Sequence, residues 1–431
     1  MTRGATSTAE ISEIRLLRKP RNRDWSFDLF TVAAVVGFAN MLLRPIPFGH
    51  GFEMVALAAS LAGHGTFADP FGALATGSSA ANPPLYPLLL ALLMKALPAA
   101  QVGLVASIGN IVANGITAAL LPRVSALLLR DQGPGVVASL FWIAVAPLTP
   151  AWDASLTVLC LLLFCMVSAP GAAKSRPVLA GVLAGVLLLL NPSCLLITLT
   201  WLGWSLVFRR SSLQRALTNA TVTLGIAALL LSPWLVRNYL VFGRFVVRTE
   251  FGATLYASNN DCAAASLVDE EANACFLTHH PNVSLGDAQL LRDMGEVRFD
   301  SLRLNQARSW IRLHPERFFQ LTAARVRNFW FPPAEGHAVK IAAIWIATVM
   351  SIPGLLLMAY RGERVAWFIF ATLVIFPGMY YVVVSDIRYR YPVLWLTLLP
   401  AGYLANALWD RLRSMSKADG NRMANGVPRA I

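Results

Sequence analysis

The chain has 431 residues, of which 56% are hydrophobic and only 14% are charged. Soluble domains carry about 25% charged residues, so this composition excludes a soluble enzyme, a disordered chain and a fibrous protein. A mean hydropathy of +0.57 agrees and predicts an integral membrane protein with several spans. In a soluble chain the net charge of +13 would suggest nucleic acid, but in a membrane protein it indicates orientation. We expect no nucleic-acid partner.

Apolar runs of about 20 residues, the length that crosses the hydrocarbon core, mark the membrane segments. We expect an all-α polytopic membrane protein with about ten to eleven transmembrane helices. The run 83–98 is shorter, begins with Pro83-Pro84 and contains Lys95, so it is either an eleventh span or a helix half in the membrane. The ten full spans are expected near residues 28–45, 102–121, 134–150, 154–170, 177–191, 193–208, 216–236, 339–360, 365–384 and 390–409.

The distribution of Lys and Arg orients these spans, because short cytoplasmic loops are enriched in basic residues. With ten spans and an interfacial 83–98, more than half of the 36 basic residues lie inside, and the tails 1–27 and 410–431 are both cytoplasmic. A crossing at 83–98 would make the basic loops inconsistent with one another. No small-residue cleavage site follows the long basic N-terminal stretch, so we expect the first span to be an uncleaved anchor.

Two segments are left on the outer face. Residues 46–101 interrupt the transmembrane core 28–236, and residues 237–338 separate that core from the C-terminal transmembrane helices 339–409. The second segment holds equal numbers of basic and acidic residues and nearly half of all 23 acids, a balance typical of a folded domain. We expect a mainly helical extracytoplasmic domain.

Local signals inside 237–338 predict helices and a disulfide. Ser284 followed by Asp287 is a capping pattern, and Pro315 suits the first position of the next helix. The segment also contains Cys262 and Cys275. If the outer face is an oxidising periplasm, we expect a disulfide between them. The alternative is two free thiols too far apart to bond.

Few acids outside that domain lie near the outer surface, and two of them are candidate catalytic groups. Glu53 follows the first span, and Asp153 lies where the third and fourth full spans meet. A carboxylate pair on this face could bind a divalent cation, Mg or Mn, through oxygen ligands, or one carboxylate could act as a general base. The alternative is that each is a helix N-terminal acid that interacts with the helix dipole.

Outer-face arginines form a second candidate set. Arg237 leaves the seventh full span, while Arg388 and Arg390 precede the last one. The planar guanidinium fork binds phosphate with paired hydrogen bonds, so these residues are candidate phosphate ligands. The alternative is anchoring at the headgroup level beside Tyr389 and Tyr391. No glycine-rich phosphate loop or Walker motif is present, so we expect no nucleotide cofactor.

Several stretches, in this order, resemble the polytopic GT-C glycosyltransferases, particularly the bacterial protein-mannosyltransferase and aminoarabinose-transferase-like group. Many members carry Asp in the first outer loop, where this chain has Glu53. The resemblance covers most of the chain between about residues 28 and 409. The stretches are GFEMVALAASLAGHGTFADPF (Gly51–Phe71), NPPLYPLLLALL (Asn82–Leu93), PWLVRNYLVFGRF (Pro233–Phe245), HHPNVSLGDAQLLRDMGEVRF (His279–Phe299) and SWIRLHPERFFQLTAARVRNFWFP (Ser309–Pro332).

The resemblance implies an enzyme that transfers a sugar from a polyprenyl-phosphate donor on the outer face of a bacterial inner membrane. The acceptor is a glycan, lipid or protein that the sequence does not name. By position, Glu53 matches the first-loop acid and Asp153 the second, as base or metal ligands. Direct displacement would invert the sugar configuration.

Two other functions remain open. A lipid or glycan transporter or flippase would carry broken helices and polar groups near mid-membrane; Asn110 and Asn114 are the nearest candidates. An O-antigen polymerase or ligase would use outer arginines without a metal. Convergence of Glu53, Asp153 and Arg388 on one cavity would favour the transferase.

Overall fold

The computed structural model describes residues 24–43, 48–49, 52–170, 176–209, 211–333 and 338–424. Most of the expected tail 1–27 and the end of the tail 410–431 lie outside these ranges. Across the described ranges the regular structure is helical, as an all-α fold predicts. The β-structure in them consists of two isolated bridges, Ala68 with Ser78 and Ser266 with Ser385.

The first half of the chain forms helices separated by short connections. Prolines follow the ends of two of them: α6 stops before Pro147, and α8 stops before Asn191-Pro192, since the residue before proline disfavours helix. The helices are α2 (Ser26–Leu43), α3 (Glu53–His64), α4 (Leu85–Ala96), α5 (Ala99–Leu129), α6 (Gly133–Val145), α7 (Ala154–Ser168), α8 (Pro177–Leu190), α9 (Cys194–Val207) and α10 (Leu213–Phe242).

The second half contains the loop domain and the last apolar helices. The loop domain has α11 (Phe251–Ala257), α12 (Leu267–Ala272), α13 (Cys275–His279), α14 (Leu285–Met294), α15 (Glu296–Leu313) and α16 (Pro315–Trp330). After it come α17 (Ala338–Tyr360), α18 (Val365–Ile375), the 3-10 helices η1 (Phe376–Tyr380) and η2 (Ile387–Arg390), and α19 (Tyr391–Ala424). The last helix therefore continues past residue 409, where the sequence predicts the end of a span.

Each of the ten apolar runs contains a helix. Among the described residues, four helices are long and apolar enough to cross a membrane: α2, α5, α10 and α17. Others, including α4 and α6 to α9, are apolar but have only 10–17 residues, fewer than the roughly 20 that a perpendicular span needs. The structure is thus compatible with a multi-pass membrane protein, while ten crossings stay a prediction.

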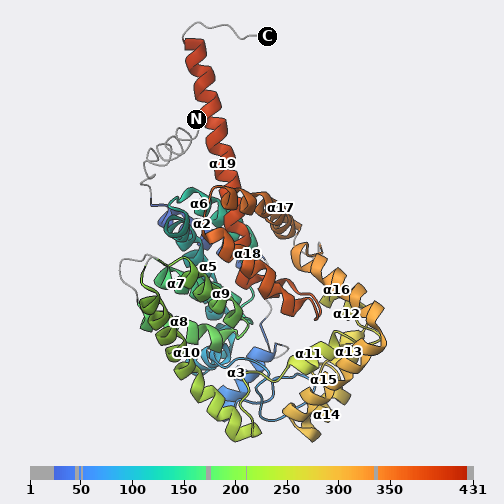
Figure 1. Cartoon of the computed structure of the whole chain (residues 1–431). Coiled ribbons are helices and arrows are strands. Elements are labelled where there is room, and N and C mark those ends of the chain that lie inside the picture. Colours follow the sequence, from blue (N-terminus) through green and yellow to red (C-terminus); the bar gives the residue numbers. More distant parts are fainter. Residues whose placement is uncertain are drawn as a thin grey trace.

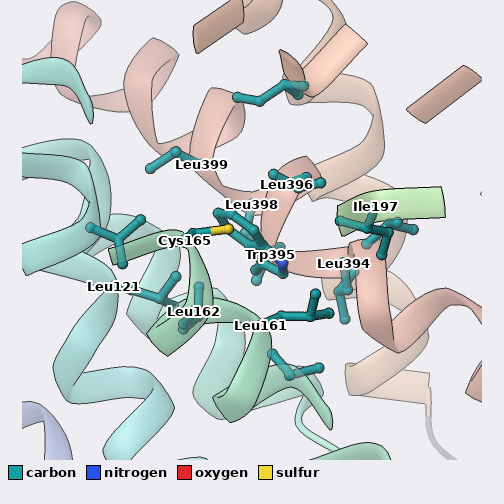
Figure 2. Close-up of a cluster of buried hydrophobic side chains, with 14 of the residues drawn as sticks. Leu121, Leu161, Leu162, Cys165, Ile197, Leu394, Trp395, Leu396, Leu398 and Leu399 are labelled. Atoms are coloured by element: carbon teal, nitrogen blue, oxygen red, sulfur yellow. The ribbon is translucent and has the colours of Figure 1, made fainter. Parts of the chain in front are cut away.

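The start of α19 lies at the centre of the helical body. Leu394 to Leu399 pack against Leu161, Leu162 and Cys165 of α7, with Leu121 of α5 and Ile197 of α9 around them (Figure 2). Gly354 of α17 faces the Pro400 carbonyl so closely that a Cβ there would overlap it. Such backbone contact through small residues is how helices associate where no hydrophobic effect drives them together.

The two ends of the molecule differ. The first turn of α2 and the last turns of α19 lie toward one end, whereas α3, α11, α14 and α15 gather at the other (Figure 1). Helix α16 runs along one side and connects the loop domain to α17. Within the loop domain, Ser284 caps α14 by accepting from the Asp287 N–H, and Pro315 is the first residue of α16, as predicted.

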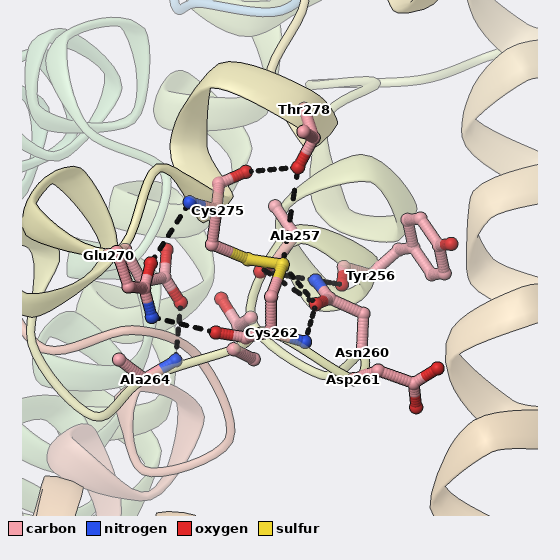
Figure 3. Close-up of a disulfide and its surroundings, with 12 residues drawn as sticks. Tyr256, Ala257, Asn260, Asp261, Cys262, Ala264, Glu270, Cys275 and Thr278 are labelled. Carbon is pink, nitrogen blue, oxygen red and sulfur yellow. Dashed lines mark hydrogen bonds between the residues drawn. A yellow bond between two sulfur atoms is a disulfide. The ribbon is translucent and has the colours of Figure 1, made fainter.

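Two features fasten the loop domain. Cys262 and Cys275 are joined by a disulfide with a Cα–Cα distance of 5.5 Å, next to Asn260 (Figure 3). Arg325 of α16 is fully buried and donates to the carbonyl of Val382 at 3.2 Å and to that of Ser258. The loop domain is therefore tied to the segment that leads into η2.

Candidate functional site

Glu53 opens α3, and its carboxylate meets two other parts of the chain. Asn82 Nδ2, just before α4, donates to Glu53 Oε2 at 3.2 Å. His280 Nε2, from the loop domain, lies 3.6 Å from Glu53 Oε1. The Glu53 side chain is only 12% exposed. The Glu53 carboxylate therefore lies where three parts of the chain meet: α3, the turn before α4, and the loop domain.

Glu250 supplies a second carboxylate at this point. One oxygen of Glu53, one oxygen of Glu250 and a ring nitrogen of His280 all lie within 4.8 Å of one another. Arg248 forms an ion pair with Glu250, and its Nε donates to the Ala81 carbonyl at 2.5 Å. Burial raises the pKa of Glu250, and although Arg248 opposes this, the charge of Glu53 adds to it.

Arg248 is the cation that the two carboxylates share. Burial lowers its pKa, but Glu250 and Glu53 outweigh burial and hold the guanidinium charged. Its side chain is nevertheless 45% exposed. Because Glu250 fixes one part of the Arg248 guanidinium and the rest is exposed, this group can bind an anionic ligand.

The protonation state of His280 follows from its surroundings. Burial lowers its pKa to about 4, so the ring is neutral at neutral pH. The Asn282 backbone N–H donates to Nδ1 at 3.2 Å, which leaves the proton of the neutral ring on Nε2. Nε2 then lies 3.6 Å from Glu53 Oε1, beyond hydrogen-bond distance, and the Phe276 ring stacks on the imidazole at 4.5 Å between centroids. His280 thus lies beside Glu53 without carrying a charge.

Arg388, in η2, approaches from the C-terminal part of the chain. Its guanidinium lies 4.3 Å from the centre of the Trp152 ring, and its Nε is 3.2 Å from Asp386 Oδ2. Burial lowers the pKa of this guanidinium, but Tyr389, Asp386 and Glu53 outweigh burial and raise it. The side chain is 32% exposed, so Arg388 is a second accessible cation close to Glu53.

The other two predicted phosphate ligands are engaged with the backbone. Arg237 donates to the Ser79 carbonyl at 2.7 Å and to the Phe67 carbonyl at 3.0 Å. Arg390 is 1% exposed and donates to the Trp330 carbonyl at 2.7 Å and to the hydroxyl of Thr348. Arg237 therefore holds the first outer loop on α10, and Arg390 joins α16 to α17.

Asp153 is not among the groups that lie within 4.8 Å of one another around Glu53. It is 7% exposed, and one of its oxygens accepts the Thr157 hydroxyl at 2.6 Å within the first turn of α7. Arg248 is close enough to act on its charge, which links Asp153 to the site electrostatically. The contact with Thr157 agrees with the alternative in which Asp153 is a structural acid at the N-terminus of α7.

Among the described residues, Glu53, Glu250 and His280 form the group that could hold a resident cation. The 3.6 Å between Glu53 Oε1 and His280 Nε2 suits two ligands about 2.1 Å from one ion. Two other contacts oppose this fit. Nε2 carries a proton when Nδ1 accepts from Asn282, and the Glu250 carboxylate is already paired with Arg248. In this arrangement the three groups do not form a ready ligand set, so we derive no step through a metal.

Sequence reasoning missed Arg248, Glu250 and His280. All three lie in the loop domain, whose equal numbers of acids and bases indicated internal neutralisation. The sequence did not single out Glu296 either. Its side chain is 8% exposed, and it accepts a hydrogen bond from the Ala80 N–H at 2.7 Å, which positions the turn beside the site. Burial raises its pKa. The only sequence signal was that the stretch His279–Phe299 belongs to the family resemblance.

No protein-family model and no curated protein matches this chain. Sequence relatives therefore assign no activity. The function has to be inferred from the charges, distances and exposure of the groups around Glu53.

Proposed function

We propose that this chain is a membrane glycosyltransferase that moves a sugar from a polyprenyl-phosphate donor to an acceptor on the extracytoplasmic face. The observation that carries the proposal is the meeting of one oriented carboxylate, Glu53, with two accessible arginines, Arg248 and Arg388. Helix α3, which Glu53 opens, lies at the end of the molecule that holds α11, α14 and α15, away from the end of α19 (Figure 1).

Glu53 is the proposed general base. Asn82 donates a hydrogen bond to its carboxylate, and His280 lies beside the other carboxylate oxygen, so the carboxylate is held in place. The acceptor oxygen or nitrogen attacks the anomeric carbon and loses its proton to Glu53, while the bond from that carbon to the phosphate oxygen breaks. The electron pair of that bond leaves with the lipid phosphate. Attack opposite the leaving group inverts the sugar.

Arg248 and Arg388 are the proposed ligands of the phosphate. Guanidinium groups stabilise the charge that grows on a leaving phosphate, and they act most strongly where they are held in advance. Glu250 fixes Arg248, while Asp386 and Trp152 fix Arg388. A lipid-linked donor is already activated, so no nucleotide has to be bound, which agrees with the absence of a nucleotide-binding motif from the sequence.

An O-antigen polymerase or ligase is the second candidate, because it would rely on the same arginines without a metal. The Arg248–Glu250 pair favours metal-free chemistry, because it already engages one of the carboxylates that a cation would need. A transporter is less well supported. Asn114 donates to the Pro147 carbonyl at 2.6 Å and Asn110 to the Thr149 carbonyl at 3.3 Å, so both amides fasten the α6–α7 connection.

The test is sugar transfer in proteoliposomes that contain the purified protein. We expect transfer from polyprenyl-phospho-sugars and none from nucleotide sugars, and the rate should survive removal of divalent cations with a chelator. Transfer abolished by the chelator and restored by Mg or Mn would contradict the metal-free mechanism and support the cation that the family resemblance implies. No turnover of any lipid-linked donor, but substrate movement across the bilayer, would support the transporter.

A further inference from the structure

A cavity lies where α7 and α9 end and α8 and α10 begin. Its volume is about 320 Å³. Arg215, in the first turn of α10, lines this cavity, whereas Arg237, near the other end of α10, holds the outer loop. At 1.5 Å per residue the two arginines are about 33 Å apart along the helix, so the cavity is separate from the proposed donor site.

Three arginines from different connections line this cavity. Arg176 immediately precedes α8, Arg209 follows α9, and Arg215 belongs to α10. Among the described residues that line the cavity there is no Asp or Glu, and the ion pairs identified in the described parts of the chain do not include these three arginines. Three like charges without a counterion destabilise their surroundings, so a bound anion would relieve them.

The remaining lining is suited to a ligand that is polar at one end. Ser205 Oγ is buried without a hydrogen-bond partner among the described groups, and Asn219 offers an amide. Leu202, Leu206 and Ala220 supply apolar surface beside them. A charged rim with an apolar wall is what a phosphate ester attached to hydrocarbon requires.

We propose that this basic cavity binds the phosphate group of an anionic phospholipid. Basic pockets between membrane helices hold lipid headgroups in this way, and each arginine near a membrane surface contributes roughly 1 kcal/mol of attraction. The inference uses the membrane placement of the chain but not its transferase chemistry. Lipid binding can therefore be tested without any activity assay.

The experiment is native mass spectrometry of the delipidated protein in detergent, titrated with phosphatidylglycerol. Phosphatidylcholine, which has no net charge, and inorganic phosphate are titrated in parallel. The test variant is Arg176→Gln/Arg215→Gln. The matched control, Arg411→Gln/Arg413→Gln, removes the same charge from exposed positions on α19. Ala220→Trp fills the cavity and keeps every arginine.

We expect the wild type to retain phosphatidylglycerol in preference to phosphatidylcholine. The double substitution in the cavity should weaken phosphatidylglycerol binding by about thirtyfold, and the control should change it less than threefold. Ala220→Trp should also lose the lipid while its unfolding temperature shows that it is folded. Equal binding by the two double variants would overturn the proposal. A response to inorganic phosphate alone, with the same arginine dependence, would overturn the lipid source and assign the cavity to a soluble phosphate.

Discussion

The Cys262–Cys275 disulfide should control how firmly His280 is held against Glu53. The bond closes a loop with a sequence separation of 13, and α13 leads directly from Cys275 to His280. Closing a loop of this length lowers the chain entropy of the open state. This stabilises the closed state by about 3 kcal/mol. Without the bond, local opening of this segment should become about a hundredfold more frequent.

Hydrogen exchange measures this opening directly. In Cys262→Ser/Cys275→Ser, amides between residues 263 and 282 should lose protection by about a hundredfold relative to wild type. The matched control is Cys160→Ser, which changes a free cysteine in α7. Unchanged protection in the double variant would refute the reasoning, because the packing of α13 alone would then hold the segment. The control should leave these amides as protected as in wild type.

Three further predictions separate catalytic from structural roles. In the transfer assay, Arg388→Gln should lower kcat/KM about 10²- to 10³-fold while its unfolding temperature stays unchanged. In melting experiments, Arg390→Gln should lower the free energy of unfolding by about 2–3 kcal/mol. A stability loss in Arg388→Gln and an activity loss in a stable Arg390→Gln would reverse the two roles. Gly354→Leu should lower the unfolding temperature sharply, because a Cβ there overlaps the Pro400 carbonyl, and a stable variant would contradict that contact. Burial lowers the pKa of His280 from 6.5 to about 4, so folding favours the neutral ring. The contribution of the neutral ring to the free energy of unfolding is therefore fully present above pH 6.5. It is lost as the pH falls toward 4, by at most about 3 kcal/mol. Melting curves of His280→Gln should lack this component, and an identical pH dependence would refute it.

Much of the helical framework follows from the sequence. The apolar runs predict where helices form, and Ser284 and Pro315 mark two helix starts correctly. The lengths are harder to predict, because hydropathy does not register where a proline ends a helix. Helix α6 stops at Val145 although the apolar run continues to about residue 150. For this reason the number of membrane crossings stays a prediction.

The site was predictable only in part. Sparse acids at the outer surface single out Glu53, and the rarity of outer arginines singles out Arg388. The sequence cannot tell whether an arginine there meets solvent or backbone carbonyls, and this is why Arg390, two residues from Arg388, looked equivalent. His280 and Glu250 reach Glu53 through contacts between segments far apart in the chain, which no local pattern encodes.

The central claim is that Glu53 is the base of a lipid-linked sugar transfer. Its most direct test is the initial transfer rate in proteoliposomes for Glu53→Gln, which keeps the size of the side chain and removes the charge. The control is Glu271→Gln, an exposed acid of the loop domain. We expect a loss of about 10²- to 10⁴-fold for Glu53→Gln and a wild-type rate for the control. Full activity of Glu53→Gln in a folded protein would contradict the account.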